Sequence, residues 1–229
     1  MRITPVAKQN LSAQLYSQLR RALMDGLFSP GERLTIAGIA DDFGTSITPV
    51  REAIFRLVSE RALEMRAATS ISVPQPGPDD LREIQRIRIE LEGTAAERAA
   101  ELITEKQLQE LAALQSRFIA AAANDPRRAS LLNREFHFQL LKIANMPLLE
   151  SIVENMWVLM GPFLRLFHDR TPSRQMSEND HRHHAVLTAL RHRDPAAARM
   201  AMAEDIRWGE HLIAQLESDT LRCPKVSVQ

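Results

Sequence analysis

The chain has 229 residues, of which 45% are hydrophobic and 25% charged, and its 29 basic and 29 acidic side chains cancel. This composition is typical of a globular protein with one large or two small domains, and the balanced charge excludes a uniformly basic nucleic-acid binder. Cys223 is the only cysteine, which excludes a disulfide or a cysteine-based zinc site within one chain. The N-terminus lacks a signal core and no apolar run approaches a membrane span, so we expect a soluble, cytoplasmic protein.

Three short helices are predicted near the N-terminus. Leucines recur every fourth residue from Leu11 to Leu27, which predicts an amphipathic helix closed by the turn Ser29-Pro30-Gly31. A second helix is predicted from Thr35 to Phe43, with Gly44 in the turn that follows it. A third helix begins near Ser46. This series is consistent with a helix-turn-helix pair preceded by a supporting helix.

The third helix has polar residues at its start and is followed by a predicted hairpin. Ser46 or Thr48 can cap this helix, and Pro49 suits its first turn. Two β-like segments come next, Leu63 to Arg66 and Ile71 to Pro74. A short helix, a glycine turn, a helix and a hairpin form the pattern of a winged helix-turn-helix, whose second helix enters the DNA major groove. Hydroxyls and an arginine there can contact phosphates or base edges, although in an isolated helix the hydroxyls can equally act as caps alone.

A linker rich in proline and glycine, from Pro74 to Pro78, separates this part from the rest of the chain. We therefore predict a DNA-binding domain over residues 1–75, where nine basic and seven acidic side chains leave a slight positive excess. Everything after the linker reads as helix, which predicts a mainly α protein with an antiparallel all-α bundle of about six helices over residues 79–218. The predicted helices run from Leu81 to Leu102, Thr104 to Ala123, Asp125 to Asn145, Pro147 to His168, Ser177 to His192 and Asp194 to Leu216.

At this point the sequence resembles a known family. Residues 15–74 are similar to the winged helix-turn-helix of the GntR transcription factors. The resemblance lies in Leu27-Phe28-Ser29-Pro30-Gly31-Glu32-Arg33-Leu34 and in Ser46-Ile47-Thr48-Pro49-Val50-Arg51-Glu52-Ala53-Ile54. It implies binding to a double-stranded DNA operator as a homodimer, with no membrane partner and with association with the nucleoid.

Some residues depart from the family pattern. The family usually has arginine at the position of Ile47, Glu-Arg at Ile36-Ala37 and Arg-Gly in the wing at Thr69-Ser70. A lost arginine contact to guanine typically costs about 1–3 kcal/mol of discrimination, so we expect an operator of altered specificity. The candidate DNA contacts are Thr35, Ser46, Thr48, Pro49, Arg51, Thr69 and Ser70.

The second domain carries a set of candidate metal ligands. Asn133 and His137 are four residues apart and share a helix face, His181, His183 and His184 cluster at the start of a later helix, and Asp205 lies on the last helix. Imidazole, carboxylate and amide groups that converge inside a bundle can hold a divalent metal. A single histidine on an amphipathic helix more often has a hydrogen-bonded core or surface role, so the residues alone leave both interpretations open.

Residues 79–215 resemble the FCD ligand-sensing domain of the FadR-type branch of the same family. The similarity includes Arg88 with Leu91-Glu92-Gly93, and Asn133 to His137 followed by Ala144-Asn145-Met146-Pro147-Leu148-Leu149. The segment from His183 to Asp194 and that from Ala198 to Met202 also match. In many such domains an aspartate and three histidines hold a metal, and the matching positions here are Asn133, His137, His183 and Asp205. The resemblance therefore implies a divalent metal (Zn, Ni or Mn), with two of the four ligands changed.

The resemblance also implies a small carboxylate-type effector. Arg88 takes the place of an anion-facing arginine, and Trp157 and Arg165 are candidate residues of the same effector pocket. The function expected is that of a ligand-controlled transcription regulator that acts as a repressor. One alternative is a regulator whose sensor no longer binds metal or ligand, because Asn133 and Asp205 depart from the pattern. A remote alternative is a metal-dependent hydrolase with Glu135 or Glu178 as its base.

Overall fold

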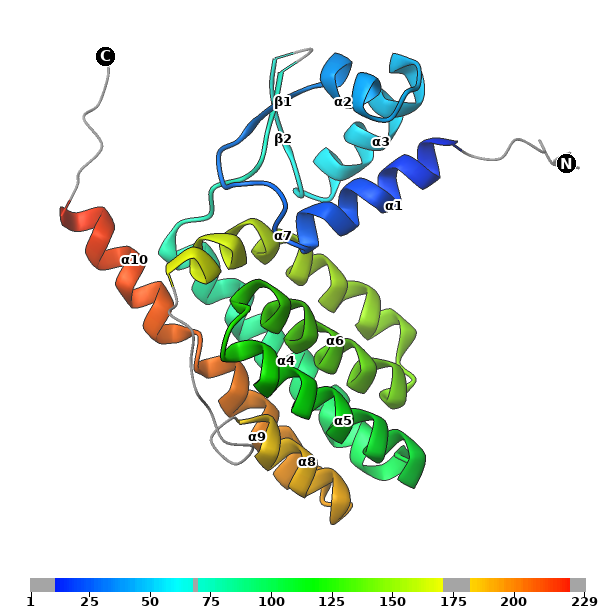
Figure 1. Cartoon of the computed structure of the whole chain (residues 1–229), viewed down its shortest axis with the longest axis vertical. Helices are drawn as coiled ribbons and strands as arrows, with labels where there is room; N and C mark the ends of the chain where they lie inside the picture. The colour runs from blue at the N-terminus through cyan, green and yellow to red at the C-terminus, as the bar shows by residue number, and fades with distance from the viewer. Residues whose placement is uncertain (1–10, 68–69, 171–181, 223–229) are drawn as a thin grey trace, which may run out of the picture.

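The computed structural model describes residues 11–67, 70–170 and 182–222, and Figure 1 shows them as two helical parts stacked one above the other. The mainly α architecture expected from the sequence, with a winged helix-turn-helix followed by a helical domain, is confirmed. The described strands are β1 (Arg33–Thr35), β2 (Glu64–Ala67) and β3 (Ser70–Ser72). The described helices are α1 (Leu11–Met24), α2 (Ile36–Asp42), α3 (Ile47–Ser59), α4 (Pro78–Leu102), α5 (Glu105–Ala122), α6 (Pro126–Ala144), α7 (Pro147–Arg170), α8 (His183–Arg191), α9 (Pro195–Arg207) and α10 (Glu210–Arg222).

The N-terminal part, which we call the reader domain, packs α1, α2 and α3 against a small antiparallel sheet of order β1-β3-β2. The strand β1 was not expected from the sequence, because its three residues show no alternation long enough to recognise. The core is formed by the inward faces of α1 and α3, and each large side chain buried there stabilises the fold by about 1.5–3 kcal/mol. Its fully buried members include Leu23, Ile54, Leu57 and Ile71.

The end of the first helix of the reader domain differs from the sequence-based prediction. The leucine stripe predicts a first helix to Leu27, but α1 ends at Met24, because Gly26 takes a positive φ of 65° that terminates the helix. Leu11 and Leu27, the two ends of the stripe, are therefore nearly half exposed. At α3 the N-cap residue is Ser46, whose side chain makes no capping hydrogen bond.

The C-terminal part, which we call the sensor domain, is a bundle in which α4 packs against α6, α7, α8, α9 and α10. Local signals fix most of its boundaries: Thr104 and Gln107 form the expected capping box, and Asp125 and Asp194 cap the helices that follow them. The prediction of one last helix from Asp194 to Leu216 is wrong. The structure has two helices, α9 and α10, that meet at Trp208-Gly209, so the described residues of the bundle form seven helices. In the described part of the chain no helix is long and apolar enough to cross a membrane.

The two domains meet where α1 crosses α7 (Figure 1). Val158 of α7 is buried within the core of the reader domain, and Met24 of α1 packs against the cores of both domains. Gly161 lies directly against the backbone of α1: a Cβ added there would lie 2.8 Å from the carbonyl carbon of Leu23 and from Cα of Met24. The crossing therefore depends on the absence of a side chain at Gly161.

Two ion pairs flank this crossing. Nη1 of Arg20 donates to Oε2 of Glu154 at 2.7 Å, and Arg134 of α6 pairs with Asp25 just after α1. All four side chains are partly buried, so these pairs help to fix the orientation of the reader domain on the sensor domain.

Candidate metal centre and nucleic-acid interface

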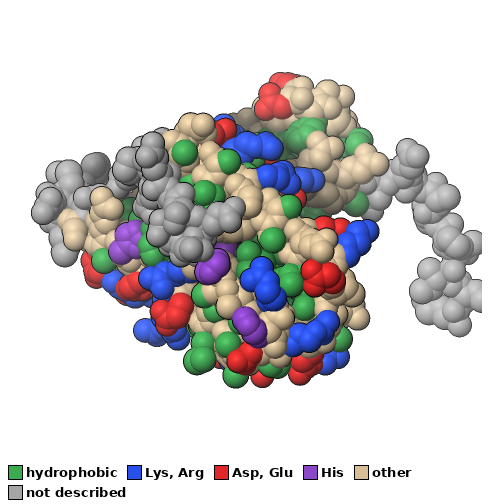
Figure 2. Space-filling model, turned by 60° about the horizontal axis from the view of Figure 1, so that its bottom comes forward, with side chains coloured by type: hydrophobic (Ala, Val, Ile, Leu, Met, Phe, Trp, Pro, Cys, Tyr) green, Lys and Arg blue, Asp and Glu red, His purple; other side chains and the backbone are tan. Residues whose placement is uncertain are grey.

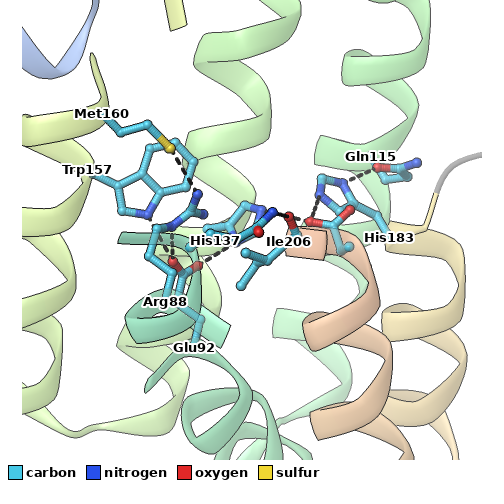
Figure 3. Close-up of polar contacts among 10 residues, drawn as sticks. Arg88, Glu92, Gln115, His137, Trp157, Met160, His183 and Ile206 are labelled. Atoms are coloured by element: carbon cyan, nitrogen blue, oxygen red, sulfur yellow. Dashed lines mark hydrogen bonds and ion pairs between the residues drawn. The ribbon is translucent and has the colours of Figure 1, made fainter. Parts of the chain in front are cut away.

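Three side chains from three helices meet inside the sensor bundle (Figure 3). His137 comes from α6, His183 from α8 and Asp205 from α9, and their potential ligand atoms all lie within 4.8 Å of one another. Nε2 of His137 is 3.2 Å and Nε2 of His183 is 3.8 Å from Oδ2 of Asp205. The structure thus brings together three of the four metal ligands proposed from the sequence.

Two further buried side chains orient the imidazole rings of His137 and His183 through their Nδ1 atoms. Nδ1 of His137 lies 2.6 Å from Oε2 of Glu92, and Nδ1 of His183 lies 2.7 Å from Oε1 of Gln115. Because carboxylate and amide oxygens only accept hydrogen bonds, both Nδ1 atoms carry the proton. A neutral ring then has its lone pair at Nε2, on the side of Asp205. Metal-binding histidines are commonly held by such outer partners.

This donor set fits a divalent first-row metal. Two imidazole nitrogens and one carboxylate oxygen lie within 4.8 Å of one another, and three protein ligands leave at least one coordination position for another group. Asn133 lies one turn before His137 on α6, is partly buried and forms no hydrogen bond within the described residues. Its amide oxygen is a neutral candidate for a fourth ligand.

A second buried cluster adjoins the first one through Glu92. Arg88 of α4 donates from Nε to Oε1 of Glu92 at 2.6 Å and stacks over the ring of Trp157 at 4.1 Å from its centroid. Nη1 of Arg88 approaches Sδ of Met160 at 3.3 Å, and Nε1 of Trp157 donates to Oε1 of Glu92 at 3.2 Å. Arg88, which the sequence suggested as a contact to an effector, therefore already has a carboxylate partner within its own helix.

Burial and neighbouring charges shift the ionisation of this cluster. Burial raises the pKa of Glu92, but the charges of Arg88 and His137 outweigh it and hold that pKa at about 2. Burial lowers the pKa of His137, but the charge of Glu92 and the hydrogen bond to Asp205 outweigh it and raise that pKa to about 9. A proton at Nε2 of His137 and a metal ion would occupy the same place, so they compete for this site.

The candidate DNA contacts lie on the exposed side of the reader domain. Ser46, Thr48 and Arg51 are exposed at the start of α3, and Pro49 is partly exposed beside them. Thr35 is also exposed, but its hydroxyl accepts a hydrogen bond from the backbone N–H of Gly38 and caps α2. Because the Thr35 hydroxyl already accepts this hydrogen bond, it has fewer lone pairs with which to contact DNA.

Two of the candidates, Thr69 and Arg165, fall wholly or partly outside the described residues. Thr69 lies outside them, and Ser70 begins β3, where it pairs with Thr35 across the sheet. Arg165 belongs to α7, but its side chain is not among the described ones. Trp157 is 1% exposed and packs in the sensor core next to Arg88.

Sequence reasoning missed the residues that connect the site, namely Glu92, Gln115 and Met160. The spacing of Glu92 four residues after Arg88 was a usable signal, because that spacing places both on one helix face. No local signal marks Gln115, whose partner is 68 residues away. Of the two bases considered for a hydrolase, Glu135 is exposed, away from the buried histidines, and Glu178 lies outside the described residues.

Comparison with known proteins gives concordant results over both domains. Residues 11–73 match the model of the gntR family of bacterial regulatory proteins, and residues 83–207 match the FCD domain. The chain is 36% identical over 196 residues to the HTH-type transcriptional regulator McbR of Escherichia coli. This alignment covers 85% of the chain and 89% of McbR. The solved structure of E. coli McbR superposes with a TM-score of 0.84 at 35% identity, over 90% of this chain and 98% of that one.

Two other E. coli regulators are more distant relatives. The Exu regulon transcriptional regulator is 29% identical over 231 residues, which covers 92% of the chain and 87% of that protein. The HTH-type transcriptional repressor RspR is 26% identical over 212 residues, which covers 92% of each. Every relative named here is a transcription regulator.

Proposed function

Since the chain belongs to the GntR family of bacterial regulatory proteins and carries an FCD domain, we propose that it is a homodimeric repressor controlled by a small organic acid, which binds in the sensor domain with a divalent metal. The chain is a DNA-binding transcription regulator and not an enzyme. The observation that carries the finer proposal is the meeting of His137, His183 and Asp205 inside the sensor domain. The name of RspR as a repressor supports the proposed direction of control.

The metal would be held by Nε2 of both histidines and by Asp205, with Asn133 as a neutral fourth ligand. When bound, it would supply a positive charge to which a carboxylate can bind. Glu92 and Gln115 fix the two rings, so the ligand atoms are oriented before a metal arrives.

The organic acid would bind between the metal ligands and Arg88. A guanidinium has five N–H donors, and Glu92 takes the one at Nε. The sulfur of Met160 is a weak acceptor, so a carboxylate would replace it with a stronger, charge-assisted bond. Nε2 of Gln115 is buried and has no hydrogen-bond partner among the described residues, which makes it a second donor for an oxygen of the ligand.

Helix α7 provides the connection between this site and DNA. Trp157 and Met160 face Arg88, while Val158 and Gly161 of the same two turns contact α1 of the reader domain. A ligand that pulls Arg88 away from Met160 would change the packing of α7 and with it the orientation of the reader domain. Two arrangements with different spacing of the DNA-reading helices in a dimer would then bind the operator with different affinity.

The direct test is an electrophoretic shift on DNA from upstream of the protein's own gene, with and without a panel of organic acids and with metal-loaded protein. We expect a shift that at least one acid weakens. A shift that no acid changes, from protein that takes up no metal, favours the second candidate, a regulator whose sensor has lost its ligand. The internal pairing of Arg88 and the neutral Asn133 are the observations that favour this alternative.

Replacing Arg51 by alanine is expected to weaken operator binding by about 5- to 150-fold per half-site, which corresponds to the loss of one contact to a guanine edge. Arg51 is exposed on α3 and forms no ion pair within the described residues, so the folded domain does not require it. Arg56→Ala is the matched control on the same helix, because its guanidinium pairs with Glu60 and lies over Tyr16. Equal losses in the two variants, measured by fluorescence anisotropy, would contradict a specific role for Arg51.

Replacing Asp205 by asparagine is expected to lower the affinity for Zn²⁺, Ni²⁺ or Mn²⁺ by at least about tenfold, because the only anionic ligand is lost while the shape is kept. Isothermal titration of chelator-treated protein measures this change. Glu204→Gln on the same helix is the control, since Glu204 is more than half exposed and pairs with Arg207. Unchanged affinity in the Asp205 variant would rule out this site as the metal centre.

A further inference from the structure

The recognition helix α3 has an apolar side chain at its start that the fold does not use. Ile47 is the first residue of α3 and is 47% exposed. The four other isoleucines described in the reader domain, Ile36, Ile39, Ile54 and Ile71, are at most 5% exposed. The buried face of α3 is formed instead by Val50, Ala53, Ile54 and Leu57. The fold therefore gains little from an isoleucine at this position.

The neighbours of Ile47 are candidate DNA contacts. Thr48 follows it directly, and Arg51 lies one turn further along, so all three side chains are on the exposed side of α3. A recognition helix presents its N-terminal residues to base edges in the major groove. Ile47 would thus lie in the groove when Arg51 reaches a base or a phosphate.

We infer that Ile47 reads the 5-methyl group of a thymine in each half-site of the operator. An isoleucine side chain offers no hydrogen bond, and the thymine methyl is the one apolar group that a standard base pair presents in the major groove. Over a guanine or cytosine edge, the same side chain would remove water from N7, O6 or N4 without replacing its hydrogen bonds. Ile47 therefore favours thymine both by contact and by exclusion of the other bases.

The inference is tested by removing the methyl group alone. Operator half-sites are first selected from a pool of random duplexes with the full-length protein, and each thymine is then replaced singly by deoxyuridine, which pairs identically. We expect one thymine position per half-site where this change lowers affinity about fourfold, or about fifteenfold when both half-sites are changed. Other thymine positions should show no such loss.

The variant Ile47→Ala assigns this sensitivity to the residue. It should bind the thymine operator about as weakly as the wild type binds the deoxyuridine operator, and it should no longer distinguish the two, as expected for directly coupled groups. Phe55→Ala is the control, because Phe55 is 51% exposed on the same helix but two turns further along. It should keep the full deoxyuridine effect.

Two results would overturn the inference: no thymine of the selected half-sites is sensitive, or the sensitivity remains in Ile47→Ala. Both are read from duplexes that the wild-type protein binds, so they are distinct from a failure of operator binding itself. Because Ile47 is exposed, the alanine variant should keep the circular dichroism spectrum and melting temperature of the wild type.

Discussion

Replacing Gly161 by alanine is expected to destabilise the contact between the reader and sensor domains by about 1–3 kcal/mol, the usual cost of overpacking. The added Cβ would lie 2.8 Å from the carbonyl carbon of Leu23, and backbone atoms of a helix cannot move aside as a flexible side chain can. We expect a lower melting temperature, and a smaller ratio between the operator affinities measured without and with effector. Differential scanning calorimetry and anisotropy titrations measure the two quantities.

Gly93→Ala is the matched control for this variant. Gly93 also lies inside a helix, but the atom nearest to its added Cβ would be Cγ of Arg199, a flexible side chain, at 3.3 Å. Relief of the helix penalty of glycine, about 1 kcal/mol, should leave this variant as stable as the wild type or more so. Equal melting temperatures for Gly161→Ala and the wild type would show that the crossing of α1 and α7 tolerates a side chain.

Replacing Glu92 by glutamine is expected to destabilise the metal-free protein by about 3–5 kcal/mol, the cost of breaking a buried ion pair from one side. Glu92 is 1% exposed and accepts hydrogen bonds from Arg88, His137 and Trp157. The variant would leave the guanidinium of Arg88 buried without its counter-charge. Denaturant unfolding at neutral pH measures the loss.

The pH dependence of stability provides a second measure of the same cluster. The pKa of Glu92 is lowered from 4.5 to about 2, so its contribution is present above pH 4.5 and is lost as the pH falls toward 2. The pKa of His137 is raised from 6.5 to about 9, so its contribution is present below pH 6.5 and is lost as the pH rises through 9. The cluster of the metal-free protein therefore contributes most between about pH 4.5 and 6.5.

The variant Glu90→Gln is the control for Glu92→Gln. Glu90 is on the same helix, but its side chain is 72% exposed and its pair with Arg199 lies at the surface, where ion pairs contribute at most about 1 kcal/mol. It should keep the pH profile of the wild type, whereas Glu92→Gln should flatten it. A flat profile in the wild-type protein itself would contradict the assigned ionisation of the cluster.

The distribution of charged side chains over the surface does not by itself indicate where DNA binds. Figure 2 shows basic and acidic side chains interspersed on the visible face of the molecule, with no large area of one sign. This agrees with the cancelling charges of the sequence. The balanced charge of the chain agrees with our proposal that operator binding depends on a few residues such as Arg51.

The parts of the structure that sequence predicts well are those specified by neighbouring residues. Thr104 and Gln107 cap each other across three residues, and Asp194 caps the backbone three residues later, so their helix starts can be read from the sequence alone. The break at Trp208-Gly209 could not, because one glycine within an amphipathic pattern is compatible with a continuous helix.

The candidate site shows the same division. Its candidate ligands His137, His183 and Asp205 were proposed from their residue types and from the resemblance to the FCD domain. Glu92 was missed although its spacing from Arg88 was a usable signal, and Gln115 was missed because its role exists only through a partner 68 residues away. No periodicity in a single sequence reports such pairs, since burial of a charged or amide side chain depends on the completed bundle.

The close crossing of α1 and α7 also limits how such regulators can be recombined. A hybrid that joins this reader domain to another sensor at the linker near Gly77 would lose Val158, which α7 contributes to the core of the reader domain. It would also need a glycine where Gly161 meets Leu23, an acidic group to pair with Arg20 and a basic group to pair with Asp25. The interchangeable unit is therefore the reader domain together with the surface of α7 that receives it, and the linker alone does not define the boundary between modules.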